Sequence, residues 1–165
     1  GPPNIEFKPV LLGELCEQLR EELETIRGDT VITVECDQPT LEVEAEERYL
    51  HRVLQNLVTN ALRYAGSRIV MVVDGDEDQV VIHVDDNGPG IPEHERERVF
   101  KPFARLDKSR HRASGGYGLG LSIVKRIVDW HGGDIRVDES PMGGARFTVI
   151  LPRSQQGQHV LGRVN

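Results

Sequence analysis

The 165-residue chain has neither a long apolar run nor an excess of positive charge. No stretch of about 18 apolar residues exists, so nothing in the sequence is expected to span a membrane, and no secretory signal pattern opens it. The net charge is −7, which argues against a general nucleic-acid binder, because neutralising phosphates requires a basic surface. The remaining composition, 38% hydrophobic and 28% charged, is typical of a soluble globular protein.

Cysteine is scarce, and its two copies show no metal-binding pattern. Cys16 and Cys36 have neither a CxxC spacing nor a matching pair of histidines, and Cys16 lies on an apolar stripe that favours a small buried side chain. The chain is therefore expected to be cytosolic and reduced. Residues 1–3 are interpreted as a tag scar with a linker, residues 4–152 as one folded domain excised from a longer protein, and residues 153–165 as a flexible tail.

Hydrophobic periodicity predicts three long helices and several strands. The predicted helices span 10–27, 46–65 and 118–131, and the predicted strands span 30–35, 41–44, 69–73, 80–85, 135–137 and 145–151. A short helix is expected from Pro92 to Phe100, followed by a loop over 101–117. The pattern predicts an α+β fold, a two-layer α/β sandwich in which a mixed, mostly antiparallel sheet packs on three helices.

A polar stripe marks the second predicted helix. Asn56, Asn60 and Tyr64 are spaced i, i+4 and i+8, and Arg63 lies beside them, opposite the apolar face. Asparagine is a poor residue for a helix interior, so two on one face need a reason. One interpretation is a solvent-facing polar surface. The other is that an amide oxygen binds Mg²⁺, which keeps several waters and takes only one or two protein oxygens.

An acidic glycine turn follows the fourth predicted strand at residues 86–91 (DNGPGI). An ordinary turn favours the same residue types. A carboxylate at Asp86 would instead accept a hydrogen bond from the exocyclic amine of adenine and select adenine over guanine. Gly88 and Gly90, which have no β-carbon, would let the main chain approach the base.

Three glycines alternate in residues 116–121 (GYGLGL), just before an apolar helix. Their amides and the positive end of the helix would form an anion site. Neither common phosphate motif fits: no G-x-x-x-x-G-K-[ST] occurs, and Leu121 and Ile123 occupy positions that G-x-G-x-x-G would fill. A flexible lid hinge is the structural alternative, and both interpretations are compatible.

A basic cluster precedes these glycines. Residues 101–112 (KPFARLDKSRHR) contain five Lys or Arg and one Asp, hence +4, which leaves −11 for the rest of the chain. A solvated loop is the simpler interpretation of such a charge run, and contact with a polyphosphate is the alternative.

In this order, the three segments resemble the N, G1 and G2 boxes of the catalytic ATP-binding (CA, HATPase_c) domain of bacterial sensor histidine kinases, in the GHKL superfamily of gyrase, Hsp90 and MutL. Residues 99–103 (VFKPF) resemble the F box of the kinases, and residues 143–148 (GGARFT) their terminal strand. The resemblance covers about residues 10–152 and looks closest to the RstB and CpxA type. It implies the Bergerat ATP-binding fold, with ATP between the helices under a lid of about residues 100–117.

The resemblance also implies roles for the polar stripe. Asn60 would hold Mg²⁺, and Asn56 would support the phosphate–metal end of the nucleotide. Arg63 replaces the lysine more often seen in this box, which preserves the charge and changes the geometry. Tyr64 would lie against the nucleotide.

At the other motifs, Asp86 would bind the adenine amine, with Thr148 a weaker candidate nearby. Arg105, just after the F box, is the lid residue implied to reach the γ-phosphate, which raises the weight of phosphate contact by the basic cluster. Further nucleotide contacts are implied for Gly88, Gly90, Ile91, Gly116, Tyr117, Gly118, Leu119, Gly120 and Leu121.

Three functions compete at this point: a histidine kinase catalytic domain, an ATPase of the same superfamily, and a nucleotide-binding module without transfer activity. Hydrolysis needs a base that orients and deprotonates water. The related ATPases place a glutamate one turn before the metal asparagine, where this chain has Asn56. An amide has no basic lone pair, so the sequence favours the kinase, with phosphate positioning by Asn56, Arg63 and Arg105 in place of an intrinsic base.

The phosphoacceptor of such a kinase is absent from the sequence. None of the six histidines is followed closely by an acidic residue, Arg and Pro, as in the acceptor motif of the family: His51, His83, His94, His111, His131 and His159. We expect the acceptor on upstream dimerisation helices of the same protein, acting in cis or in trans. A response regulator is the expected partner of the intact kinase, nucleic acid is not, and the domain is expected on the cytoplasmic side of a bacterial inner-membrane sensor.

Overall fold

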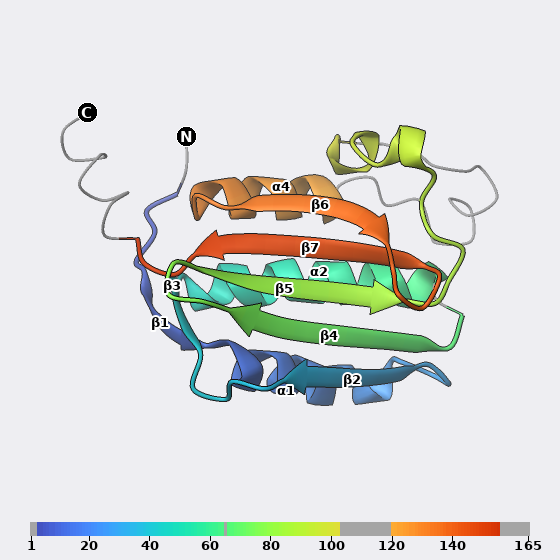
Figure 1. The fold of residues 1–165 in the computed structure, drawn as a ribbon, viewed down its shortest axis with the longest axis horizontal. Helices are drawn as coiled ribbons and strands as arrows, with labels where there is room; N and C mark the ends of the chain where they lie inside the picture. Colours follow the sequence, from blue (N-terminus) through green and yellow to red (C-terminus); the bar gives the residue numbers. More distant parts are fainter. Residues whose placement is uncertain (1–2, 65, 103–119, 156–165) are drawn as a thin grey trace.

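The computed structural model describes residues 3–64, 66–102 and 120–155. A five-stranded sheet in the order β2-β4-β5-β7-β6 forms one layer, and α1, α2 and α4 form the other (Figure 1). The elements are β1 Lys8–Leu11, α1 Leu12–Glu22, β2 Val31–Cys36, β3 Glu42–Ala45, α2 Glu47–Tyr64, β4 Arg68–Gly75, β5 Gln79–Asp86, α4 Gly120–Trp130, β6 Asp134–Glu139 and β7 Ala145–Pro152. Only β2 and β4 pair in parallel within this sheet, so the predicted mixed, mostly antiparallel α+β sandwich is confirmed.

The core lies between the sheet and the helices. Along β5, Val80, Ile82 and Val84 are at most 1% exposed, whereas His83 points to the other face, as the alternation predicts. In register, Val84 lies opposite Phe147 of β7, the largest fully buried side chain among the described residues. Cys16 of α1 is also fully buried, and burial raises the pKa of its thiol to about 12. None of the helices in the described ranges is long and apolar enough to cross a bilayer.

The beginning of the fold differs from the sequence prediction. Residues 8–11 form the edge strand β1, which pairs antiparallel with β3, and α1 starts at Leu12 instead of residue 10. Pro9 obscures the strand because proline cannot donate to a ladder, although an edge strand tolerates it. Ile26, expected on the buried stripe, is 60% exposed, because α1 gives way to a 3₁₀ turn at Leu23–Thr25.

The segment expected as one short helix from Pro92 to Phe100 also differs. It forms two 3₁₀ turns, η2 Glu93–Glu95 and η3 Arg98–Phe100. η3 buries Val99 and packs the Phe100 ring edge-on against Phe147, with centroids 6.0 Å apart. The aromatic contact anchors η3 to the core.

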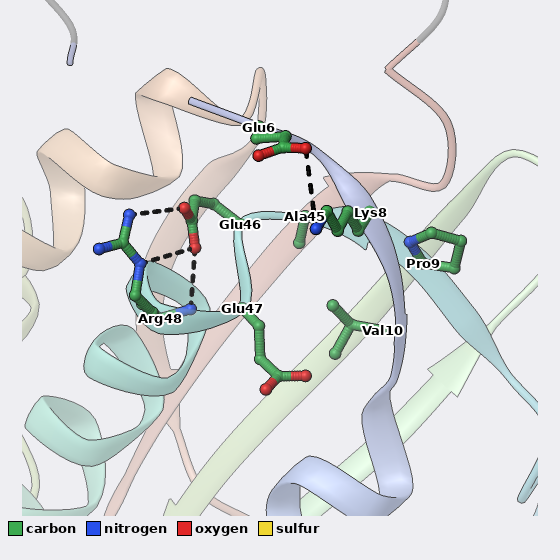
Figure 2. Close-up of a pocket in the computed structure, with 8 residues that line it drawn as sticks. All are labelled: Glu6, Lys8, Pro9, Val10, Ala45, Glu46, Glu47 and Arg48. Carbon is green, nitrogen blue, oxygen red and sulfur yellow. Dashed lines mark hydrogen bonds and ion pairs between the residues drawn. The ribbon is translucent and has the colours of Figure 1, made fainter. Parts of the chain in front are cut away.

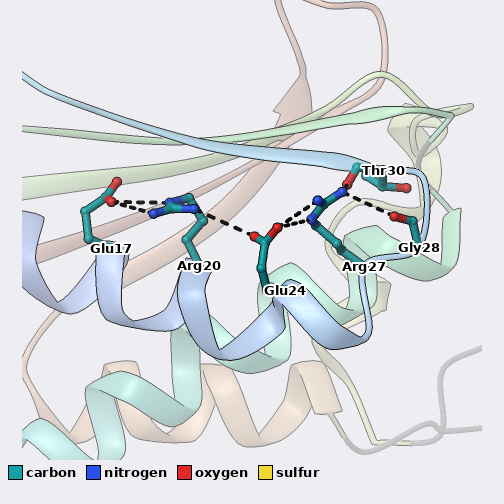
Figure 3. Close-up of polar contacts among 6 residues, drawn as sticks. All are labelled: Glu17, Arg20, Glu24, Arg27, Gly28 and Thr30. Carbon is teal, nitrogen blue, oxygen red and sulfur yellow. Dashed lines mark hydrogen bonds and ion pairs between the residues drawn. The ribbon is translucent and has the colours of Figure 1, made fainter.

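A chain of ion pairs runs along α1 and the turn that follows it (Figure 3). Arg20 Nη2 lies 3.1 Å from Glu17 Oε2, and Arg27 Nη2 lies 2.7 Å from Glu24 Oε1. These pairs are solvent-screened and contribute little to stability. Arg27 has a second role, because its Nη1 donates to the carbonyl oxygens of Gly28 and Thr30 at 3.2 and 3.1 Å and so closes the end of the helical segment.

His131 connects α4 to the start of α2 at one end of the sandwich. Its Nδ1 lies 2.8 Å from the Ile127 carbonyl oxygen of α4, and the Glu46 amide donates to its Nε2 at 3.1 Å. These two bonds require the neutral tautomer with hydrogen on Nδ1. The ring of Phe7 packs edge-on against it, with centroids 5.4 Å apart. Burial lowers the pKa of His131, which is 1% exposed.

The chain after β7 docks at the same end, so the expected flexible tail does not begin at residue 153. The Glu44 amide donates to the Arg153 carbonyl oxygen at 2.9 Å. Gln155 is fully buried and donates from Nε2 to the His131 carbonyl oxygen at 2.7 Å. These contacts fix residues 153–155, and residues 156–165 lie outside the described ranges.

Replacing His131 with phenylalanine is expected to lower the free energy of unfolding by about 1–3 kcal/mol at pH 7.5, because it takes the acceptor away from the Glu46 amide and removes the side-chain hydrogen bond to the Ile127 carbonyl oxygen. The folded pKa of His131 lies below the ordinary 6.5, so its contribution is complete above pH 6.5 and is lost as the pH falls toward the folded value. Urea unfolding should show the difference between wild type and variant narrowing at pH 5.5, by less than about 1.4 kcal/mol. A difference independent of pH would contradict this assignment.

Candidate active site

The described parts of the three sequence motifs gather at one end of the sandwich. The last turn of α2, the first turn of α4 and the end of β5 lie at the same side of Figure 1. Asn87 connects two of them, since its Oδ1 accepts hydrogen bonds from the amides of Ser67 and Arg68 at 2.9 and 3.0 Å. Sequence reasoning treated Asn87 as a turn former only. Its role depends on a contact with the chain that follows α2, which the local sequence does not reveal.

The polar stripe of α2 faces α4, and its burial speaks against the solvent-facing interpretation. Asn60 is only 7% exposed, and Asn56 is half-buried and donates from Nδ2 to the Gly120 carbonyl oxygen at 3.4 Å. A purely solvent-facing surface does not fit this burial. The stripe borders a small cavity of about 70 Å³ lined by Asn56, Thr59, Asn60, Arg63, Gly120 and Leu121.

Asp86 is held in place by the main chain. The carboxylate is 4% exposed, and its Oδ1 accepts from the Gly88 amide at 2.9 Å and from the Ala145 amide at 3.1 Å. Gly144 makes this approach possible, because a β-carbon there would overlap Asp86 Oδ1 and stand 2.6 Å from the Gly88 nitrogen. Gly90 has φ +75°, the left-handed region that favours glycine. The acidic turn therefore holds the Asp86 carboxylate in a fixed orientation. Gly144 and Ala145 contribute to this arrangement, and the sequence prediction did not include them in the site.

The family follows from a comparison with known proteins. Residues 45–155 match the family of histidine kinase-, DNA gyrase B- and HSP90-like ATPases. The chain belongs to this family. The matched range contains the polar stripe of α2, the acidic turn at residues 86–91 and the alternating glycines of residues 116–121. The resemblance was based on these three segments.

The relatives of this HATPase_c chain are sensor kinases. Sensor histidine kinase CpxA of Escherichia coli strain K12 is 45% identical over 103 residues, which cover 62% of this chain and 22% of CpxA. Sensor protein RstB of the same strain is 46% identical over 105 residues, which cover 64% of this chain and 24% of RstB. The chain thus spans about a quarter of the length of the curated relatives it matches.

Solved kinase structures match nearly all of the chain. The catalytic domain of histidine kinase ThkA has a TM-score of 0.81 at 32% identity, covering 92% of this chain and 99% of that one. Histidine kinase ThkA in complex with response regulator protein TrrA has a TM-score of 0.77 at 30% identity, covering 92% of this chain and 43% of that one. This HATPase_c domain therefore has the architecture of a histidine kinase catalytic domain.

Thr148 is the one described site residue that the structure does not bring to this HATPase_c site. It lies opposite His83 in register, and its hydroxyl lies 2.9 Å from His83 Nδ1. Asp86 and Ala145 lie on the helix-facing side, whereas Thr148 lies on the reverse face of the sheet and is 1% exposed. Thr148 therefore does not lie beside Asp86 as expected, and Ala145 is the β7 residue whose amide contacts that carboxylate.

The remaining predicted contacts divide into described and undescribed residues. Ile91 is buried, and its carbonyl oxygen accepts from Arg96 Nε at 3.1 Å, which fixes the exit of the acidic turn. Arg63 is exposed and Tyr64 half-buried at the end of α2. Most of the expected lid lies outside the described residues, including Arg105, Gly116, Tyr117, Gly118 and Leu119.

A larger cavity lies at the opposite end of this HATPase_c domain (Figure 2). It measures about 420 Å³ and lies between β1 and the start of α2. Two ion pairs take up four of its five charged side chains: Lys8 Nζ lies 3.7 Å from Glu6 Oε1, and Arg48 Nη2 lies 2.8 Å from Glu46 Oε1. The Arg48 guanidinium holds the pKa of Glu46 below its usual value. The smaller cavity beside Asn60 remains the candidate active site, because residues of the sequence motifs line it and none of them lines the larger cavity.

Proposed function

We propose that this chain is the ATP-binding catalytic domain of a two-component sensor histidine kinase, which binds Mg-ATP and donates its γ-phosphoryl group to a histidine on a separate dimerisation domain. The transfer breaks the bond between the γ-phosphorus and the bridging oxygen, forms a bond to an imidazole nitrogen, and releases ADP. Catalysis by the chain consists of positioning and charge neutralisation. Membership of the family and the match to an isolated kinase catalytic domain support this proposal.

The observation that carries the kinase assignment is Asn56. It lies one helical turn before Asn60, and its amide donates to the Gly120 carbonyl oxygen between α2 and α4. A neutral amide used in this way neither deprotonates water nor orients it as a base would. ATP bound beside it would persist until a stronger nucleophile arrives, and this supports transfer to histidine over hydrolysis.

The donor set beside the cavity fits Mg²⁺ shared with phosphates. Asn60 and Asn56 offer neutral amide oxygens, and Mg²⁺ in nucleotide sites takes one or two protein oxygens while phosphates and waters complete its octahedron. Mg²⁺ would neutralise charge on the phosphoryl group during transfer. We assign Asn60 as the metal ligand because it is the more deeply buried of the two, and Arg63 as an additional positive charge near the phosphates.

Asp86 is the residue of the proposed site that recognises the adenine base. Its carboxylate is fixed by two main-chain amides, so its acceptor orientation costs no reorganisation when ATP binds. A fixed acceptor pairs with the exocyclic amine of adenine and meets the carbonyl oxygen of guanine unfavourably. This arrangement supports selection of ATP over GTP.

The partners of the proposed kinase lie outside this chain. Among the described histidines, His51 Nε2 lies 2.9 Å from Glu22 Oε1, His83 and His131 are hydrogen-bonded within the fold, and the exposed His94 lacks the acceptor motif. The acceptor would come from upstream dimerisation helices of the full-length protein. A response regulator would be the next phosphoryl acceptor, as the complex of the relative ThkA with TrrA supports. The domain would act on the cytoplasmic side of a membrane sensor.

The purified chain is expected to bind one Mg-ATP, to hydrolyse it slowly and not to label itself with the γ-phosphoryl group. Titration calorimetry with ATP, GTP and ADP, with and without Mg²⁺, measures the binding. Incubation with γ-labelled ATP measures transfer, first for the chain alone and then with its own dimerisation helices added. Label should appear only on the added helices.

Two other outcomes would assign the chain differently. Rapid, saturable ATP hydrolysis by the chain alone would identify an ATPase of the same superfamily. Binding of ATP without any transfer to the added helices would identify a nucleotide-binding module that has lost its chemistry. Absence of ATP binding would reject all three functions.

A further inference from the structure

Asp85 and Arg146 form a bidentate ion pair on the face of the sheet that points away from the helices. Arg146 Nε lies 2.7 Å from Asp85 Oδ1, and its Nη2 lies 2.8 Å from Oδ2. The Asp85 side chain is 5% exposed and that of Arg146 is 27% exposed. A planar guanidinium that meets both carboxylate oxygens fixes distance and angle together, unlike a point charge.

The pair is adjacent in both strands to the carboxylate that we assign to adenine. Asp85 precedes Asp86 on β5, and Arg146 follows Ala145, whose amide donates to Asp86 Oδ1 at 3.1 Å. Asp85 and Arg146 are also the last registered pair between β5 and β7 at this end. Because successive side chains point to opposite faces, the ion pair joins on the reverse face the same strand ends that hold Asp86 on the inner face.

The ion pair between the ends of β5 and β7 is important because both strands connect directly to turns of the proposed site. β5 continues directly into the acidic turn, and β7 is preceded by a tight turn in which the Ser140 amide donates to the Gly144 carbonyl oxygen at 2.7 Å. The ladder between β5 and β7 stops at Asp85 and Arg146, and beyond it Asp86 pairs with β4 and Ala145 with β6. The position of the Ala145 amide relative to Asp86 therefore depends on the last contact between the two strands. A recognition group must be held within about 0.5 Å of its productive position, and supporting contacts behind it provide that restraint.

We propose that Asp85 and Arg146 are positioning residues for adenine recognition, which act from the reverse face of the sheet by fixing the Ala145 amide on Asp86. This inference rests on the proposed binding of ATP and adds residues that determine its base specificity. Neither residue touches the nucleotide side. Their effect passes through the register of β5 and β7.

The test removes both charges at once in the double variant Asp85→Asn/Arg146→Met, so that no buried charge is left unpaired. Calorimetry with ATP and with GTP measures both affinities, and circular dichroism measures folding. We expect ATP affinity to fall about tenfold, an effect that one weakened hydrogen bond to a charged group accounts for. GTP affinity should change little, so the ratio of ATP to GTP affinity falls.

Two single variants complete the design. Arg136→Met lies on the same outer face in β6, where Arg136 Nε is 3.3 Å from Asp138 Oδ2 and the side chain is 56% exposed; it should keep the wild-type ratio. Arg146→Lys retains the charge but loses the bidentate contact of the guanidinium with Asp85. It should lower the ratio of ATP to GTP affinity by less than the double variant does.

The outcomes separate this inference from the function on which it rests. A folded double variant with wild-type ATP affinity and ratio overturns the positioning role, as does a lower melting temperature without a change in ratio. If the double variant does not fold, the ratio of Arg146→Lys decides: a reduced ratio supports the inference and a wild-type ratio overturns it. A wild-type chain that binds no ATP rejects the proposed function instead.

Discussion

Replacing Gly144 with alanine is expected to weaken ATP binding roughly 100-fold while leaving most of the fold intact. The added β-carbon would overlap Asp86 Oδ1 and lie 2.5 Å from the Asp86 carbonyl oxygen and 2.6 Å from the Gly88 nitrogen. All of these atoms belong to the main chain or to the carboxylate itself, so no flexible side chain can move aside. Asp86 must then leave the amides of Gly88 and Ala145, and the site loses its oriented acceptor.

Gly133→Ala is the matched control for this variant. Its β-carbon would overlap the Ile150 carbonyl oxygen and lie 2.6 Å from Leu151 Cδ2, a clash of the same kind outside the motif segments. This control should lower the melting temperature, and its folded fraction should bind ATP with wild-type affinity. Calorimetry below the melting temperature compares the two. Equal ATP affinity in both variants and the wild type would contradict the proposal that Gly144 is needed to hold Asp86 in its binding orientation.

Much of the fold follows from local patterns. The apolar stripe of α2 and the alternation of Val80, Ile82 and Val84 on β5 predict their buried faces because each depends on periodicity alone. β1 did not follow, because Pro9 weakens the strand signal and the partner strand begins more than 30 residues later. The parallel pairing of β2 with β4 is likewise a long-range contact that no hairpin signal announces.

The site was predictable where the residue type was unusual for its local structure. Two asparagines on one helix face and an aspartate before alternating glycines stand out without any structure. Asn87, Gly144 and Ala145 look ordinary in sequence, and their importance arises from contacts across 20 and 59 residues of chain. Thr148 is a different case, because the strand alternation already separates it from Ala145 and contradicts its assignment to the adenine end.

Asn60→Ala is expected to abolish the contribution of Mg²⁺ to ATP binding. Supporting residues around metal ligands typically account for 10–100-fold in metal affinity, so loss of the ligand itself should cost at least about tenfold. Alanine is a better helix former than asparagine, so α2 should be retained. Calorimetric titration with ATP, with and without Mg²⁺, measures the effect as the ratio of the two affinities. This ratio should fall to about one in the variant.

Two further variants distinguish metal ligation from a general effect on α2. Asn60→Asp keeps an oxygen at the same position and adds charge, so it should retain the Mg²⁺ dependence that alanine removes. Arg52→Ala changes an exposed residue of the same helix and should leave both affinities unchanged. If Asn60→Ala keeps the wild-type Mg²⁺ dependence, the ligand is not Asn60, and the amide of Asn56 becomes the next candidate on the same stripe. If all three variants lose ATP equally, the effect lies in the helix and not in the metal.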